Sequence, residues 1–251
     1  TKSLLTCFDF HFNEEQGLKL IEINTNASLY LPIVLQRCAQ IDRCVPPQFD
    51  ELLASFVEAF KLNTGDGISV FDEVQEKEGL YFEFLIFREW LAQKGYSTNI
   101  VSLESFAEKS HKNVYNRYTD FYLDEDRSKE VAQAYFSGAK KFSPNPREYA
   151  LLADKRCLEV LRQQLTTTHA DLASVIPETR TFDEFPDVES LWKERKKFFF
   201  KPSSGFGSKG AFAGKSISRK AFDKLYSPDF IAQEYCPAGK RTFSLDGQDY
   251  T

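Results

Sequence analysis

The sequence predicts a mixed α/β fold (α+β in its hairpin regions), and three features indicate it. Residues 3–24 read as two strands joined by the polar turn NEEQG, a pattern typical of a β-hairpin. Residues 67–103 alternate strand, helix and strand, the order of a parallel unit with a right-handed crossover. In the last third, the strand-like runs KFFFKP and FIAQEY enclose a glycine-rich segment. Parallel and antiparallel strands are therefore expected in one chain.

The first half begins with strands at 3–12 and 17–24. Helices are expected at 29–44, with Pro32 in the first turn, and at 46–62, where apolar residues recur at helical spacing. The next elements form the alternating unit: strand 67–74, helix 80–95, strand 98–103 and short helix 104–110.

Residues 114–138 are mixed in character, and 140–150 form a proline-rich connector. One helix is expected over 149–165, with Leu151, Leu152, Leu158, Val160 and Leu161 supplying its apolar positions. The remaining elements are a helix leading into strand 197–202, a glycine-rich segment 203–216, helix 217–226, and strands 230–235 and 240–247.

Composition indicates a globular protein in a reducing compartment. The 251 residues are 42% hydrophobic and 27% charged, and the net charge is -5. This charge gives no broad footprint for nucleic acid, no run approaches the roughly 18 apolar residues of a membrane span, and the start is not typical of a signal peptide. The 5 cysteines form no CxxC pair, and with 3 histidines a zinc site is disfavoured. We expect a cytoplasmic protein without nucleic-acid or membrane partners.

The stretch LIEINTNAS, residues 20–28, ends an apolar strand on polar side chains. Alternation places Glu22 and Asn24 on one face of the strand and Ile21 and Ile23 on the other. Two interpretations are open at this point. The strand runs into an asparagine-rich turn, or the acid and the amide form a pair of metal ligands.

The run GFGSKG, residues 205–210, matches G-x-G-x-x-G, and glycine lets backbone N–H groups approach phosphate closely. A dinucleotide-binding loop would open directly into a helix, whereas AFAGKSI reads as a second strand. A Walker A loop fails by one position, because Lys209 stands where its first glycine belongs. A phosphate-covering loop between two antiparallel strands fits best, and a flexible hairpin tip with solvated lysines is the ordinary alternative.

Four fragments together resemble the ATP-grasp superfamily. FFFKPSSGFGSKGAF is similar to its phosphate-covering loop, FIAQEYCPAG to its adenine-reading hinge, and LLADKRCLEVL to a helix with a nucleotide-binding lysine. FDFH with LIEINTN resembles its metal-binding strands. The E-x-N strand comes first here instead of after the hinge. This order is similar to the circularly permuted ligases, namely eukaryotic-type glutathione synthetases and glutathionylspermidine synthases.

The resemblance implies three segments. Residues 1–64 would carry the metal-binding strands of the ATP-grasp core. Residues 65–145 would form a βαβ substrate domain, and residues 146–251 the nucleotide-binding region with the glycine loop and hinge.

The resemblance also implies ATP and Mg²⁺ as cofactors, with Asp9, Glu22 and Asn24 as metal ligands. Asp9 has the alternatives of capping a turn or binding substrate. The implied nucleotide contacts are Lys155, Lys201, Ser204, Gly205, Gly207, Lys209, Gln233 and Glu234. Each also has an ordinary alternative, such as a solvated lysine or an edge strand with alternating polar residues.

For the chemistry, Arg241 is a candidate to stabilise developing phosphoryl charge, and Arg117 to bind a substrate carboxylate. The implied function is an ATP- and Mg-dependent carboxylate–amine ligase that acts through an acyl phosphate on a small molecule or peptide. The loop SSGFGSKG lacks the acid that glutathione synthetases usually carry after Lys-Pro. A non-catalytic ATP-binding protein and a small-molecule kinase therefore remain alternatives.

Overall fold

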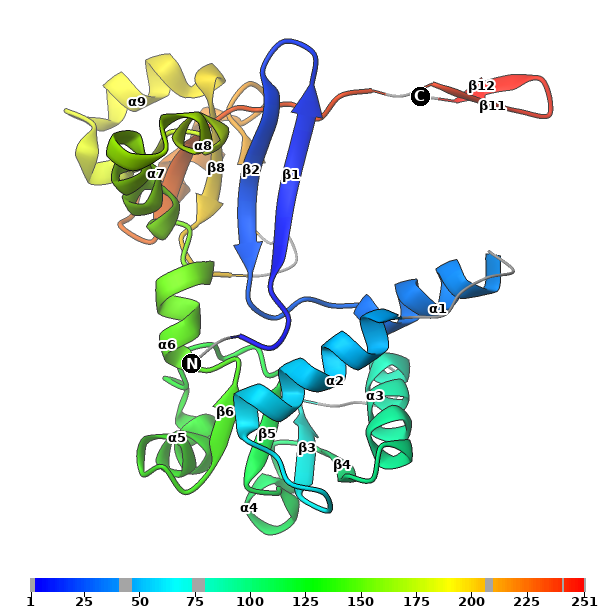
Figure 1. The fold of residues 1–251 in the computed structure, drawn as a ribbon. Coiled ribbons are helices and arrows are strands. Elements are labelled where there is room, and N and C mark those ends of the chain that lie inside the picture. Colours follow the sequence, from blue (N-terminus) through cyan, green and yellow to red (C-terminus); the bar gives the residue numbers. More distant parts are fainter. Residues whose placement is uncertain (1–2, 41–46, 74–79, 206–209, 241, 251) are drawn as a thin grey trace. The chain divides into compact units, whose positions relative to one another are not determined.

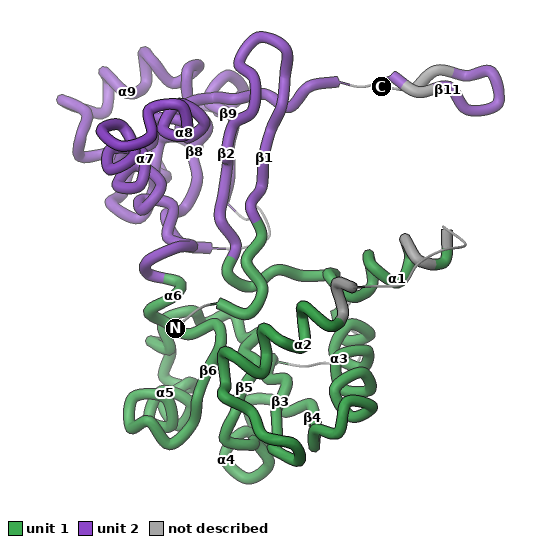
Figure 2. Tube along the Cα trace, in the orientation of Figure 1, with its two compact units in different colours: residues 1–7, 25–149 green, residues 8–24, 150–251 purple. Residues whose placement is uncertain are grey.

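The computed structural model describes residues 3–40, 47–73, 80–205, 210–240 and 242–250 (Figure 1). No helix in these ranges is long and apolar enough to cross a membrane. The chain clusters into two compact units, each made of two segments (Figure 2). Unit 1 contains Thr1–Cys7 and Thr25–Tyr149, and unit 2 contains Phe8–Asn24 and Ala150–Thr251.

Unit 1 is built on a four-stranded parallel sheet with the strand order β4-β3-β5-β6. β3 (Gly67–Phe71), α3 (Tyr81–Gln93) and β4 (Ser97–Val101) form the expected β-α-β unit, and β3 pairs with β4 in parallel. β5 (Asn113–Asn116) and β6 (Lys141–Ser143) complete the sheet. The parallel unit predicted from the alternation of elements is confirmed.

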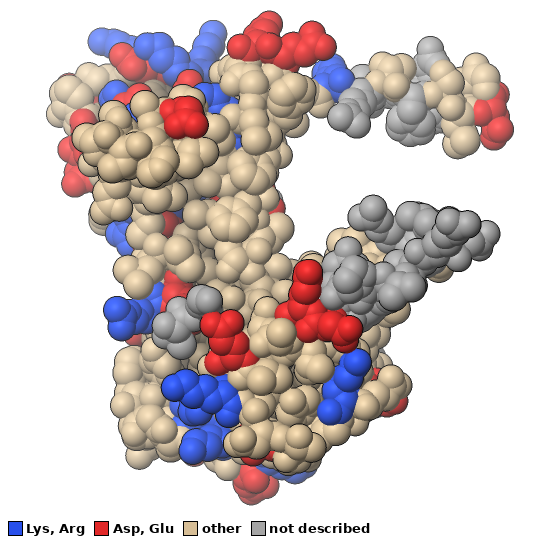
Figure 3. Space-filling model, in the orientation of Figure 1, with Lys and Arg blue, Asp and Glu red and all other residues tan. Residues whose placement is uncertain are grey.

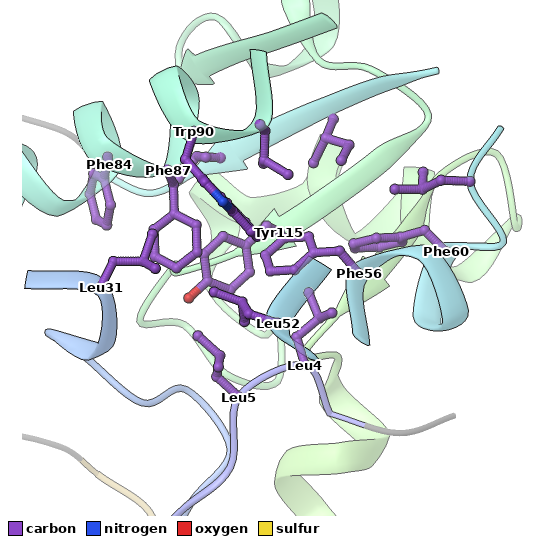
Figure 4. Packing of buried hydrophobic residues seen from close by; sticks show 14 residues of the cluster. Leu4, Leu5, Leu31, Leu52, Phe56, Phe60, Phe84, Phe87, Trp90 and Tyr115 are labelled. Carbon is purple, nitrogen blue, oxygen red and sulfur yellow. The ribbon is translucent and has the colours of Figure 1, made fainter. Parts of the chain in front are cut away.

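β3 is buried on both faces, as is usual for parallel strands. Its side chains alternate between two aromatic-rich clusters: Ile68 and Val70 belong to one, and Phe71 belongs to the other. Phe56 lies at the centre of the first cluster, fully buried (Figure 4). Its ring packs within 6.3 Å, between centroids, of the rings of Phe60, Phe87, Trp90 and Tyr115.

The helices of unit 1 besides α3 are α1 (Tyr30–Gln40), α2 (Pro47–Phe60), α4 (Phe106–Lys109), α5 (Lys129–Phe136) and α6 (Pro146–Glu148), and the 3-10 turn η1 spans Asp126–Ser128. Of these helices, α1, α2 and α4 lie at predicted positions, whereas α5 lies in the segment described only as mixed and α6 in the expected proline-rich connector. A capping box closes the first turn of α6. The backbone N–H of Glu148 donates to Oδ1 of Asn145, and the backbone N–H of Asn145 donates to Oε2 of Glu148, both at 3.1 Å.

Unit 2 combines a hairpin with an antiparallel sheet. β1 (Cys7–Asn13) and β2 (Gly17–Asn24) form the hairpin, and the φ of +69° at Gly17 in the turn suits glycine. The sheet has the order β7-β10-β8-β9, with β7 at Thr179–Thr181, β10 at Phe230–Glu234, β8 at Phe198–Pro202 and β9 at Phe212–Ala213.

Helices and short turns complete unit 2. They are α7 (Cys157–Thr168), α8 (Ala170–Val175), α9 (Val188–Glu194) and α10 (Arg219–Leu225), with 3-10 turns η3 at Phe182–Glu184 and η4 at Arg195–Lys197. β11 (Phe243–Leu245) and β12 (Gln248–Tyr250) pair with each other as a hairpin. The fully buried Phe200 of β8 and Phe222 of α10 pack together in the core, 5.3 Å between ring centroids.

One predicted element is wrong in its continuity. The single helix expected over 149–165 is a π-helical turn, η2 (Tyr149–Ala153), followed by α7, which begins at Cys157. Asp154 lies between them, and its carboxylate accepts from the backbone N–H of Arg156 at 3.0 Å. This local hydrogen bond competes with the helical pattern and allows a break. The short strands β5, β6, β7 and β12, with 3 or 4 residues each, and the short helix α8 were not predicted.

The three segments predicted from the resemblance do not coincide with the two units: the segment 65–145 lies within unit 1, and the segments 1–64 and 146–251 are each divided between the units. Residues 8–24, from the segment 1–64, cluster with 150–251, whereas residues 25–64 cluster with the parallel sheet. The polypeptide thus contributes to unit 2 from two stretches that are far apart in sequence.

Candidate functional site

The hairpin of unit 2 carries the three predicted metal ligands. Asn24, the last residue of β2, donates from Nδ2 to Oδ2 of Asp9 on β1 at 2.8 Å. Glu22 lies two residues earlier on β2, with its side chain 24% exposed. Two carboxylates and an amide oxygen are the donor set that Mg²⁺ prefers. The described residues contain no group of three or more His, Cys, Asp or Glu side chains placed to hold a metal by themselves.

Lys155 is buried beside Glu22. The Nζ of Lys155 lies 3.2 Å from Oε1 of Glu22, and its side chain is 7% exposed. The break between η2 and α7 places Lys155 here, and its backbone N–H donates to the carbonyl of Ser203 at 2.9 Å. This bond ties the break to the chain that leaves β8. The predicted lysine therefore comes from a turn and not from the middle of a helix.

Lys201 is the second buried lysine of unit 2, and its side chain points towards β2 and β10. Its Nζ donates to Oε1 of Gln233 at 2.9 Å and to the carbonyl of Ile21 at 3.4 Å. Burial lowers the pKa of Lys201 to about 8. The nearby charge of Glu22 raises this pKa and that of Lys155 lowers it further, with smaller raising effects from Asp9 and Cys236.

The glycine loop leaves from β8 and returns on β9. The two strands pair antiparallel, with Phe199 opposite Ala213 and Phe200 opposite Phe212. The predicted loop between two antiparallel strands is thus confirmed, and no helix opens directly behind it. Ser204 and Gly205 are exposed at its start. Gly207 and Lys209 lie outside the described residues.

The predicted hinge is β10 and the residues after it. The backbone N–H of Glu234 donates to the carbonyl of Glu178 at 2.8 Å, and that of Tyr235 donates to the carbonyl of Lys197 at 2.7 Å. Gln233 is 1% exposed, whereas Glu234 is half-buried. The side chain of Gln233 therefore points into unit 2, a direction that sequence reasoning did not assign.

Arg117 belongs to unit 1, where it is buried at the end of the parallel sheet. Its guanidinium donates to the side chain of Asn26, to the carbonyl of Ala27 at 2.7 Å and to the hydroxyl of Ser28 at 2.6 Å. An oxygen of Glu83 lies 4.0 Å from its Nη2. Arg241, the other predicted catalytic residue, lies outside the described residues.

Glu83 is a buried acid beside Arg117 that sequence reasoning missed. It is fully buried on α3, and burial raises the pKa of its carboxyl, while Arg117 acts in the opposite direction. A single acid in the apolar run LYFEFLIF was the available signal. Buried carboxylates need a partner, and the arginine of YNRYTDF supplies it here.

The charges on the face shown in Figure 3 are mixed. Lys and Arg are interspersed with Asp and Glu, and residues of other kinds cover most of that face. The two lysines that matter most for the candidate site, Lys155 and Lys201, are buried and contribute little to such a surface.

No protein-family model and no curated protein matches the sequence. Solved structures do match the fold. A provisionally named gamma-glutamylcysteine synthetase from Methylobacillus flagellatus KT aligns with a TM-score of 0.56 and 13% identity, over 91% of this chain and 67% of that one. A glutathione synthetase-like effector from Globodera pallida aligns with a TM-score of 0.55 and 12% identity, over 92% of this chain and 59% of its own. The chain has an ATP-grasp, glutathione synthetase-like fold.

The ATP-grasp ligase PsnB, solved with minimal precursor, Mg and ADP, also matches, with a TM-score of 0.40 and 16% identity over 70% of this chain and 67% of that one. Within the ATP-grasp fold, five of the predicted residues lie together in unit 2: Asp9, Glu22, Asn24, Lys155 and Lys201. Arg117 lies in unit 1.

Proposed function

We propose that this protein is an ATP- and Mg-dependent ligase that joins a carboxylate to an amine on a small molecule or peptide. The observation that carries the proposal is the meeting of two buried lysines with the acidic end of the hairpin. Lys155 contacts Glu22, and Lys201 contacts the backbone of β2 one residue earlier. Buried lysines beside side chains that can bind Mg²⁺ suit the binding of the negatively charged triphosphate of ATP.

The donor set of the hairpin fits Mg²⁺, which would supply positive charge to neutralise phosphate oxygens. Asp9, Glu22 and Asn24 would hold it, and Asn24 is already oriented by its hydrogen bond to Asp9. Lys155 and Lys201 would hold phosphate oxygens.

The proposed ligation would transfer the terminal phosphoryl group of ATP to a substrate carboxylate, which breaks its bond to the β-phosphate and releases ADP. The amine then attacks the resulting acyl phosphate, an amide bond forms and phosphate leaves. The protein's work is positioning and charge neutralisation, so no nucleophilic side chain is needed. Arg117 would bind a carboxylate of the substrate, after giving up part of its contact with residues 26–28.

Two other functions share the same scaffold. The loop SSGFGSKG has no acidic residue, which favours a non-catalytic ATP-binding protein. A small-molecule kinase would use the same metal and lysines without an amine. The intact E-x-N pair and its contacts with Lys155 and Asp9 favour catalysis over simple binding.

A turnover assay separates these three functions. The protein is incubated with Mg-ATP and a panel of amino acids, γ-glutamyl peptides and polyamines, singly and in pairs, and ADP and phosphate are measured. A ligase releases phosphate only when an acid and an amine are present together. ADP release with one substrate and no free phosphate indicates a kinase. ATP binding without turnover across the panel would contradict the ligase and support the binding protein.

A further inference from the structure

We infer that Gln233 is a positioning residue for Lys201, linking the nucleotide sheet to the metal-binding strand. This inference rests on the proposed function, because it assigns Lys201 to phosphate. It differs from the hinge role expected from the sequence, in which the backbone of Gln233 reads adenine. The side chain instead forms a bridge between three strands.

The strand register places the two side chains together. In the antiparallel pair of β8 and β10, Lys201 lies opposite Ile231 and Phe199 lies opposite Gln233. Gln233 is therefore the diagonal neighbour of Lys201 on the same face of the sheet. Oε1 of Gln233 accepts from Nζ of Lys201 at 2.9 Å, and both residues are buried.

The amide nitrogen of Gln233 bonds to the metal-binding strand. Nε2 donates to the carbonyl of Ile21 on β2 at 3.2 Å, the same carbonyl that Lys201 contacts at 3.4 Å. It also lies 3.5 Å from the hydroxyl of Thr179 on β7. Gln233, Lys201 and Ile21 thus form a closed triangle next to Glu22.

A glutamine suits this position because it offers both an acceptor and a donor. The acceptor holds the buried ammonium group of Lys201, which also donates to the carbonyl of Ile21 at 3.4 Å. The donor fixes β2, so the lysine and Glu22 keep a constant relative position. An apolar side chain of the same size would leave the buried ammonium without its closest acceptor.

Nucleotide affinity in a double-mutant cycle tests the inference. The variants are Gln233→Met, Lys201→Met and the double variant. The matched control is Gln164→Met, at an exposed glutamine on α7. Gln233→Met should weaken Mg-ATP binding about tenfold, because a hydrogen bond to a charged group is lost. In the Lys201→Met background the same change should alter affinity less than about twofold.

Equal losses of Mg-ATP affinity from Gln233→Met in both backgrounds would overturn the inference, because Gln233 would then act independently of Lys201.

A second readout is the pH at which Mg-ATP affinity falls as Lys201 loses its proton. Removing the acceptor should move that midpoint to lower pH, and Gln233→Glu should move it to higher pH. Groups facing Lys201 are Glu22, Asp9, Lys155 and Cys236, which are the same in all variants. A pH midpoint of Mg-ATP affinity that is unchanged in both Gln233→Met and Gln233→Glu would also overturn the inference.

Failure of the proposed function can be told apart from failure of this inference. If the unaltered protein binds no nucleotide, the proposed function fails, and the cycle is then measured on urea unfolding. Gln233→Met should lower the unfolding midpoint more in the lysine-containing protein than in Lys201→Met, because only the former keeps a buried ammonium that has lost its closest acceptor. Equal shifts would reject the bridge irrespective of nucleotide.

Discussion

Lys201 is the residue whose environment says most about the site. A buried ammonium loses its hydration, and only Gln233 and the carbonyl of Ile21 accept from it within the described residues. Such a group lowers stability and is typical of sites that bind an anion. The depressed pKa of Lys201 has a measurable consequence for folding.

Stability should depend on pH through Lys201. The pKa is about 8 in the folded protein against 10.5 for an ordinary lysine, so the unfolded chain binds more protons between these values. The contribution of Lys201 is therefore unfavourable at neutral pH and is relieved as pH rises. Relative to Lys201→Met, the protein should gain about 2 kcal/mol between pH 7.5 and 10 in urea unfolding. If the difference in unfolding free energy between the protein and Lys201→Met does not change with pH, the burial of the Lys201 charge is contradicted.

Arg117 should be important for stability as well as for substrate. Arg117→Leu removes the donors that hold residues 26–28 and leaves the buried carboxylate of Glu83 without its cation. We expect a loss of about 3–5 kcal/mol in unfolding free energy. Adding Glu83→Gln should restore part of it, because the uncompensated charge is gone. If the second change destabilises the variant further, the pairing is wrong.

Sequence reasoning reached the site residues that have a chemical signature. Lys201 stands out as a lysine within an apolar strand, and Glu22 with Asn24 stands out by strand alternation. Gln233 was noticed for its backbone only. Its role depends on the register of β10 against β8, which fixes which residues are diagonal neighbours and cannot be read from either strand alone.

At the scale of elements, the hairpin and the parallel unit were predictable because their patterns are long. β1 with β2 and β3-α3-β4 each extend over several alternating or periodic positions. β6 and β7 have 3 residues each, too few for alternation to show. The break at Asp154 was missed because the apolar periodicity of 149–165 continues through it, while the competing hydrogen bond is local.

The return of the chain from the glycine loop depends on one glycine. A Cβ at Gly214 would lie 1.8 Å from the carbonyl oxygen of Arg195, and the N–H of Gly214 donates to the carbonyl of Phe198 at 2.9 Å. Gly214→Ala should therefore destabilise the protein by about 3 kcal/mol, since backbone would have to shift. Lys220→Ala, exposed on α10, should change stability by less than about 0.5 kcal/mol. Equal unfolding temperatures for Gly214→Ala and Lys220→Ala would contradict the close approach of Gly214 to the carbonyl of Arg195.

At the scale of the whole molecule, the chain enters unit 2 twice. Residues 8–24 supply the acidic hairpin, and residues 150–251 supply both buried lysines and the strands around the glycine loop. This arrangement agrees with the permuted order expected from the E-x-N strand, which stays a prediction. Sequence distance concealed the pairing of Glu22 with Lys155, because only the resemblance linked two segments so far apart.

The central claim is that these two segments form one Mg-ATP site. Calorimetric titration of ATP with and without Mg²⁺ tests it on the unaltered protein, on Glu22→Gln and on the control Glu15→Gln in the exposed hairpin turn. We expect Mg²⁺ to strengthen ATP binding at least about tenfold, which corresponds to about 1.4 kcal/mol, in the unaltered protein and the control. Glu22→Gln should lose that gain. ATP binding that is independent of Mg²⁺ and unchanged in Glu22→Gln would contradict the claim.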